Sequence, residues 1–220
     1  MPDMIFICYA DEKFIMQQER SIQAAINVGF QYYSTYNRDD LINTEFYKEN
    51  KYILDLSRGG GYWLWKPFFI LEAFKRISKN DIVVYSDCGD ICNNGIVEFV
   101  SSYMNTNDIL LVGREFINRQ WTKRDCFVLM NCDSDNFHNG TQLEAGFCCF
   151  KKTDSVTSFL EEWLMYGKNK NIITDEPNIC GKDNFPDFKD HRHDQSILSL
   201  LSIKYNIPRV GVGNFISYNV

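Results

Sequence analysis

The chain has 220 residues, of which 45% are hydrophobic and 24% are charged, and its formal net charge is −6. This length is enough for one large domain or two small ones, and the composition is ordinary for a soluble globular protein. The negative charge argues against general binding to nucleic acid, which requires a basic face. No apolar stretch approaches the roughly 20 residues that are needed to cross a bilayer.

The amino-terminal segment Met1–Tyr9 has neither a basic stretch nor a long apolar core, so it lacks the features of a signal peptide. We therefore expect a cytoplasmic protein whose eight cysteines are mostly reduced. No Cys-x-x-Cys pair is present, which disfavours zinc binding by cysteine.

Apolar runs between turn residues predict strands, and apolar residues at helical spacing predict helices between them. The expected strands are Met4–Tyr9, Phe30–Tyr36, the apolar run Ile82–Tyr85 that leads to Asp87, Asp108–Gly113 and Gly146–Phe150. The expected helices cover residues 16–28, 67–77, 96–103 and 156–164, and a last one begins near Asp194. Residues 37–57 are expected to be loop and short helix, and residues 167–192 a long polar loop. This alternation predicts a single α/β domain over residues 1–220.

The run Asp81-Ile-Val-Val-Tyr-Ser-Asp87-Cys-Gly-Asp90 ends a short apolar strand in two acids. The carboxyl ends of strands are where open α/β sheets usually bind ligands. Carboxylate oxygens there suit Mg²⁺ or Mn²⁺, which in turn binds a diphosphate. The alternative is a plain Asp-Gly turn after the strand.

Three glycines, Gly59 to Gly61, lie between Arg58 and Lys66. Glycines let the backbone approach a ligand closely, and the two cations suit phosphate contacts. The spacing matches neither a P-loop nor a dinucleotide fingerprint, and a flexible turn with solvated cations is the alternative. The aromatic residues that follow, Tyr62, Trp63 and Trp65, are more often core residues than stacking surfaces.

The segment His191-Arg-His193-Asp194-Gln195 precedes an apolar helix. Asp194 alone would be explained as a helix cap. Two of the three histidines of the chain lie here, however, and histidine beside a polar loop suits metal binding or phosphate polarisation. Glu144 opens the strand at Gly146, where it suits hydrogen bonds to sugar hydroxyls or simply faces solvent.

Taken in order, these motifs resemble the GT-A class of nucleotide-sugar glycosyltransferases over nearly the whole chain. The resemblance is carried by Gly-Tyr-Trp-Leu-Trp-Lys-Pro67, Tyr-Ser-Asp87, Ala-Gly146 and His-Asp-Gln195. It is strongest to the small single-domain enzymes of bacterial surface-polysaccharide clusters and of large DNA viruses that glycosylate their capsids. It implies one Rossmann-related domain with a central, mostly parallel sheet flanked by helices.

The resemblance also implies roles for particular residues. The family motif is usually Asp-x-Asp, but here Gly89 stands two residues after Asp87, and the second acid is Asp90. The implied Mn²⁺ or Mg²⁺ ligands are Asp87, Asp90 and one of His191 and His193. The implied contacts to the nucleotide sugar are Tyr9, Arg58, Lys66, Asp87, Gly146 and Gln195. The implied catalytic carboxylate is Asp194, with Glu144 as second choice.

The expected activity is metal-dependent transfer of a sugar, of the hexosyltransferase type, from a nucleoside-diphosphate donor to a glycan hydroxyl. A UDP-sugar is the favoured donor. If the protein is viral, its expected location is the host cytoplasm. The alternatives are a nucleotidyltransferase acting on sugar phosphates and a non-catalytic carbohydrate-binding module. A nucleotidyltransferase would normally carry a glycine-rich loop after the first strand, and residues 9–13 contain no glycine.

Overall fold

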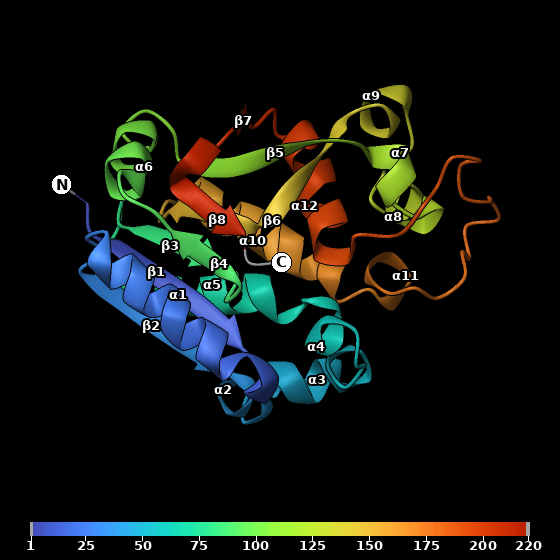
Figure 1. Ribbon diagram of the computed structural model, residues 1–220. Helices are drawn as coiled ribbons and strands as arrows, with labels where there is room; N and C mark the ends of the chain where they lie inside the picture. Colours follow the sequence, from blue (N-terminus) through green and yellow to red (C-terminus); the bar gives the residue numbers. More distant parts are fainter. Residues whose placement is uncertain (1, 219–220) are drawn as a thin grey trace.

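The computed structural model describes residues 2–218, which form a six-stranded sheet with helices on both faces (Figure 1). The order of the strands is β2-β1-β3-β6-β5-β7. Their bounds are β1 Met4–Ala10, β2 Tyr32–Asn37, β3 Ile82–Ser86, β5 Ile109–Ile117, β6 Thr141–Lys151 and β7 Arg209–Val210. β1 is parallel to β2 and β3, and β5 is parallel to β7, whereas β6 is antiparallel to β3 and β5. Only β6 therefore runs against the others in this sheet, and the predicted α/β fold with a mostly parallel sheet is confirmed.

A second, two-stranded sheet pairs β4 (Asp90–Cys92) with β8 (Ile216–Tyr218) in antiparallel fashion. β4 begins at the second acid of the predicted motif, so Asp90 starts a strand rather than simply ending a turn. This pairing brings the last described residues of the chain next to the carboxyl end of β3.

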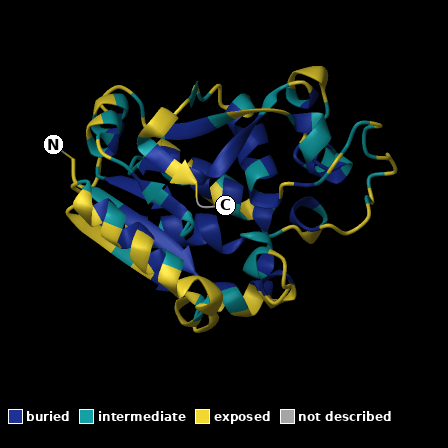
Figure 2. Ribbon diagram, in the orientation of Figure 1, coloured by how far each residue is buried: buried dark blue, intermediate teal, exposed yellow. Residues whose placement is uncertain are grey.

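Two cores lie on opposite faces of the main sheet. Along β1, Ile7 and Tyr9 face one core, and Phe6 and Cys8 face the other, as the two-residue period of a strand requires. The first core is covered by α5 (Trp65–Arg76), α10 (Asp154–Gly167) and α12 (His193–Lys204). The second is covered by α1 (Ile15–Asn27) and α6 (Ile96–Met104). Figure 2 shows the resulting buried centre of the sheet.

Residues 37–57 are more regular than the sequence predicts, because two helices form there. Asn37 caps α2 (Arg38–Ile42) through a capping box with Asp40, and Thr44 caps α3 (Glu45–Leu54). Pro67 is the third residue of α5 rather than the first, a position where the missing N–H is still harmless. The shorter helices are α7 Asn118–Trp121, α8 Arg124–Leu129, α9 Asp135–His138 and α11 Lys170–Ile173, with 3₁₀ turns at Glu12–Phe14 and Gly213–Phe215.

The glycine run forms one left-handed helical turn, α4 (Gly59–Tyr62). Five consecutive residues, Gly59 to Trp63, have φ between +55° and +99°. The Trp63 N–H donates to Gly59 O at 3.2 Å, and a Cβ on Gly61 would lie 2.6 Å from Leu54 Cα. Glycine avoids the steric cost of this conformation, but Tyr62 and Trp63 are each destabilised by roughly 1–2 kcal/mol. Such strain is typically found at functional sites.

Within residues 2–218, no helix is both long enough and apolar enough to cross a membrane.

Candidate functional site

Asp87 follows the carboxyl end of β3, where the sequence predicts a ligand site. The Tyr85 hydroxyl donates to Asp87 Oδ1 at 2.5 Å, and Lys66 Nζ lies 3.2 Å from the same oxygen. The Asp87 N–H donates to Gly146 O at 2.7 Å and so ties the end of β3 to β6. Because both side-chain partners hold Oδ1, Asp87 Oδ2 is left for a ligand.

Three carboxylates converge on Gly146. A Cβ built on Gly146 would lie 3.1 Å from Asp90 Oδ2, 3.1 Å from Glu144 Oε1 and 3.2 Å from Asp87 Oδ2. The three oxygens therefore surround one point, and any two of them are separated by at most twice 3.2 Å. Burial raises the pKa of Asp90 to about 8, and repulsion from Asp87 and Glu144 adds to the shift. This concentration of carboxylates favours binding of a cation.

Asp87 and Asp90 fit part of a ligand shell for Mg²⁺ or Mn²⁺. Within the described residues, no group of three or more His, Cys, Asp or Glu side chains is arranged to hold a metal by itself. Mg²⁺ in phosphate-transfer sites is commonly held by one or two carboxylates, with substrate phosphates and water completing the shell. The free oxygens of Asp87 and Asp90 therefore suit an ion that arrives with a diphosphate.

Replacing Gly146 with alanine should disturb this group of carboxylates and little else. Gly146 does not have a positive φ, so its backbone tolerates a side chain, but the new methyl group would press on all three oxygens. We expect a folded protein with at least tenfold weaker Mn²⁺-dependent nucleotide binding, about 1.4 kcal/mol, measured by calorimetry. Gly211→Ala is the matched control, because a Cβ there meets no atom within 4 Å. Equal nucleotide affinity in the two variants would contradict the role given to Gly146.

Lys66 is buried, with 2% of its side chain exposed, and it links the two halves of the site. Its Nζ donates to Ala145 O at 2.8 Å and lies 3.2 Å from both Asp87 Oδ1 and Asp194 Oδ2. Burial lowers the pKa of Lys66, but attraction to Asp194 and Asp87 outweighs it and raises the pKa overall. The ammonium of Lys66 thus donates one hydrogen bond to a carbonyl oxygen and forms ion pairs with two carboxylates. In this structure Lys66 therefore positions carboxylates, and its expected contact with phosphate stays a prediction.

The two candidate bases have different surroundings. Asp194 lies in the first turn of α12, where burial raises its pKa to about 6 and Lys66 partly offsets the shift. Glu144 lies on β6, where burial raises its pKa, and Arg114 Nη2 lies 2.5 Å from its Oε2. Glu144 Oε1 belongs to the group of carboxylates around Gly146, whereas Asp194 reaches that group through Lys66.

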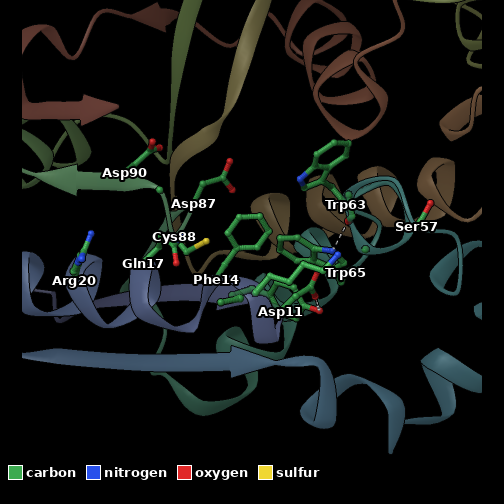
Figure 3. A pocket seen from close by; sticks show the side chains of 16 residues that line it. Asp11, Phe14, Gln17, Arg20, Ser57, Trp63, Trp65, Asp87, Cys88 and Asp90 are labelled. Atoms are coloured by element: carbon green, nitrogen blue, oxygen red, sulfur yellow. Dashed lines mark hydrogen bonds between the residues drawn. The ribbon is translucent and has the colours of Figure 1, made fainter. Parts of the chain in front are cut away.

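A cavity of about 980 Å³ opens beside Asp87 and Asp90 (Figure 3). Tyr9, Trp63 and Trp65 form part of its wall. Tyr9 and Trp65 stack with ring centroids 3.9 Å apart, and the Tyr9 hydroxyl donates to Asp11 Oδ1 at 2.7 Å. Trp65 belongs to the first core, as expected, and Trp63 packs against that core, while both also line the cavity. Its remaining lining residues are Ala10, Asp11, Lys13, Phe14, Gln17, Arg20, Ser57, Gly59, Gly60, Cys88 and Gly89.

The two late histidines are both buried, and they differ in the atoms left for a ligand. His191 Nδ1 accepts from the Lys123 N–H at 3.3 Å, and His191 Nε2 donates to Ile172 O at 2.8 Å. Both ring nitrogens of His191 are therefore engaged within the protein in this structure, and a metal role for His191 stays a prediction. His193 Nδ1 lies 2.7 Å from Ile173 O, and burial lowers the pKa of His193 to about 4. A metal role for His193 stays a prediction.

Arg58 and Gln195 also have partners within the protein. The two terminal nitrogens of Arg58 each lie 2.8 Å from a carboxylate, one on Asp175 and the other on Asp190. Arg58 therefore links the loop at residues 174–192 to the left-handed turn and lies outside the residues that line the cavity, and its expected contact with phosphate stays a prediction. Gln195 Nε2 donates to Gln142 Oε1 at 3.1 Å. The contact of Gln195 with a nucleotide sugar stays a prediction.

Several residues of the site are not singled out by the sequence. Tyr85 fixes Asp87, and its place within the Tyr-Ser-Asp motif is the one signal that could have found it. Phe14 lines the cavity from the turn before α1. Arg114 contacts Glu144 because the β5–β6 ladder places Val112 opposite Glu144, and this long-range register has no local signal in the sequence.

No protein-family model and no curated protein sequence matches this chain. Among solved structures, it is similar to the apo form of WbbM, a bifunctional glycosyltransferase, with a TM-score of 0.53 and 12% identity. The match covers 91% of this chain and 37% of that one, so this chain spans little more than a third of WbbM's length.

Two further structures are similar at lower scores. Mouse xyloside xylosyltransferase 1 gives a TM-score of 0.49 and 10% identity over 96% of this chain and 84% of that one. The galactosyltransferase LgtC, in complex with donor and acceptor sugar analogues, gives a TM-score of 0.48 and 11% identity over 90% of this chain and 70% of that one. The likeness to WbbM shows that this chain has the fold of the GT-A glycosyltransferases, as the sequence motifs predict.

Proposed function

We propose that this chain is a glycosyltransferase that moves a sugar from a nucleoside-diphosphate donor to a hydroxyl of a glycan, with Mn²⁺ or Mg²⁺ as cofactor. The observation that carries the proposal is the convergence of Asp87, Asp90 and Glu144 on Gly146 beside the 980 Å³ cavity. The shared fold supports it. The motif resemblance favours a UDP-sugar donor and an acceptor from a surface polysaccharide or a viral capsid.

In the proposed reaction, the bond between the anomeric carbon and the donor phosphate oxygen breaks, and a bond to the acceptor oxygen forms. When bound, the divalent ion neutralises charge on the departing diphosphate. Asp87 and Asp90 would hold that ion, and Tyr85 and Lys66 keep Asp87 in place. Asp194 or Glu144 takes the acceptor proton or stabilises positive charge at the anomeric carbon.

The proposal is tested by incubating the protein with a panel of nucleoside-diphosphate sugars, with Mn²⁺ or with EDTA, and measuring the nucleoside diphosphate that is released when the sugar is transferred to water. A transferase should release it from at least one donor only in the presence of metal. A nucleotidyltransferase would instead release pyrophosphate from a nucleoside triphosphate and a sugar phosphate. A carbohydrate-binding module would show neither reaction.

Asp90→Asn should raise the Mn²⁺ concentration needed for half-maximal activity. Asparagine keeps the shape of the side chain but removes the charge that attracts the ion. If Asp90 only shapes the start of β4, activity should fall by the same factor at limiting and at saturating Mn²⁺. Titration of activity with Mn²⁺ distinguishes the two roles, and an unchanged metal requirement argues against Asp90 as a ligand.

A further inference from the structure

The cavity beside Asp87 is lined only by residues from the first half of the chain. All of its lining residues fall between Tyr9 and Asp90. The candidate bases Glu144 and Asp194 come from the second half, on β6 and α12. If the donor occupies the cavity, the acceptor must approach from the side formed by β5, β6 and the start of α12 (Figure 1).

On that side, β5 leaves the ladder next to the site. Gly113 pairs with Leu143, and Ile117 pairs with Thr141. The chain therefore advances four residues along β5 where it advances only two along β6. Three residues of β5, Arg114 to Phe116, therefore lie opposite one residue of β6, and all three are exposed. Bulges are frequent beside active sites, where they redirect side chains. Arg114 pairs with Glu144 here, and Phe116 is 49% exposed.

Two cationic side chains lie over the ring of Trp121, the last residue of α7, next to this bulge. Its ring lies 5.4 Å from the Phe116 ring. The Arg192 guanidinium lies 4.4 Å from the centroid of Trp121, and Lys189 Nζ lies 5.5 Å from it. Within residues 2–218, neither cation has a carboxylate within ion-pairing distance, and both are exposed. This is notable in a chain with a net charge of −6, because the two positive charges remain available to an anion.

We propose that Arg114, Phe116, Trp121, Lys189 and Arg192 form an acceptor platform that binds a sugar carrying an acidic group, either a carboxylate or a phosphate. The inference rests on the proposed transferase function. The exposed Phe116 ring offers an apolar surface to the C–H face of a sugar, and the cations select the acidic group.

Both ends of the acceptor platform lead to a candidate base. Arg114 is paired with Glu144, and Arg192 stands two residues before Asp194. The Arg192 N–H donates to Trp121 O at 3.0 Å, which fixes the start of α12 to the acceptor platform. A sugar bound beside Arg114 would lie next to Glu144, the candidate base that Arg114 contacts.

The test measures binding of methyl glucuronide, glucose 6-phosphate and methyl glucoside by saturation-transfer NMR, with Mg²⁺ and UDP present. The two acidic sugars distinguish carboxylate from phosphate, and the neutral glucoside is the reference. We expect at least one acidic sugar to bind about fivefold more tightly than the glucoside, as two exposed ion pairs would provide. The double variant K189A/R192A should lose this preference, and Phe116→Ala should weaken binding of all three sugars.

Matched controls lie far from the site. Tyr33→Ala removes a ring that is 50% exposed on the edge strand β2, and Lys79→Ala removes an exposed cation. Neither should change binding of the sugars. If no sugar binds, if the wild type shows no preference for an acidic sugar, or if K189A/R192A keeps that preference, the acceptor platform is refuted.

Calorimetry of UDP with Mg²⁺ on the same variants separates this inference from the proposed function. UDP affinity should be equal in the wild type and in all of these variants. UDP binding without platform-dependent sugar binding refutes only the acceptor platform. Platform-dependent sugar binding in a protein that binds no nucleoside diphosphate refutes the donor assignment and leaves the acceptor platform in place.

Discussion

Replacing Asp87 with asparagine should reduce sugar transfer by at least about 10²-fold, the usual cost of removing one strong electrostatic contact to a reacting group. Asparagine retains an oxygen that can accept the hydrogen bond from the Tyr85 hydroxyl, so the end of β3 should keep its shape. What is lost is the charge that faces Asp90 and Glu144 across Gly146. Turnover and melting temperature are measured on the same preparation, and we expect the melting temperature to change little, because 39% of the Asp87 side chain is exposed.

Asp11→Asn is the matched control for this variant. Asp11 lines the same cavity and accepts a hydrogen bond from Tyr9, but it is not one of the carboxylates around Gly146. Its loss should cost much less activity than the loss of Asp87. Near-normal turnover in Asp87→Asn would mean that the metal and the diphosphate bind elsewhere.

Lys66→Met should be the most destabilising single change at the site. It removes the cation between Asp87 and Asp194 and leaves the buried Asp194 carboxylate without its ion-pair partner. Breaking a buried ion pair in this way typically costs about 3–5 kcal/mol of unfolding free energy. Urea denaturation measures the loss. Lys75→Met, on the exposed side of the same helix, breaks only a surface pair with Glu72 and should cost less than about 1 kcal/mol.

A double variant isolates the pair itself. In Lys66→Met combined with Asp194→Asn, no buried charge is left at residue 194. The double variant should therefore be more stable than the sum of the two single losses predicts. Simple additivity, or a loss in Lys66→Met as small as that in Lys75→Met, would show that the ion pair does not hold the site together.

The sequence predicts the sheet well because its signals are local. The apolar run before Asp87 and the apolar stripe from Val156 to Leu164 each specify their element without reference to the rest of the chain. The helices α2 and α3 were harder to predict because polar caps at Asn37 and Thr44, rather than apolar periodicity, mark their starts.

The site is harder to predict because each cation's role depends on which acid the fold brings to it. Arg58 and Lys66 look alike in the sequence as phosphate ligands, yet Arg58 pairs with residues more than a hundred positions away, and Lys66 is buried against Asp194. His191 likewise becomes a structural residue because Lys123 and Ile172 pack around it. By contrast, Asp87, Asp90 and Gly146 come together because the carboxyl end of a strand places them there.

The most direct test of the account is calorimetric titration of the wild-type protein with a panel of nucleoside diphosphates, with Mn²⁺ and with EDTA. If Asp87 and Asp90 share an ion with a diphosphate, at least one nucleotide should bind at least about tenfold more tightly with Mn²⁺, a difference of about 1.4 kcal/mol. Equal affinities with and without metal, or no binding of any nucleoside diphosphate, would contradict the assignment of this edge of the sheet as a metal–diphosphate site.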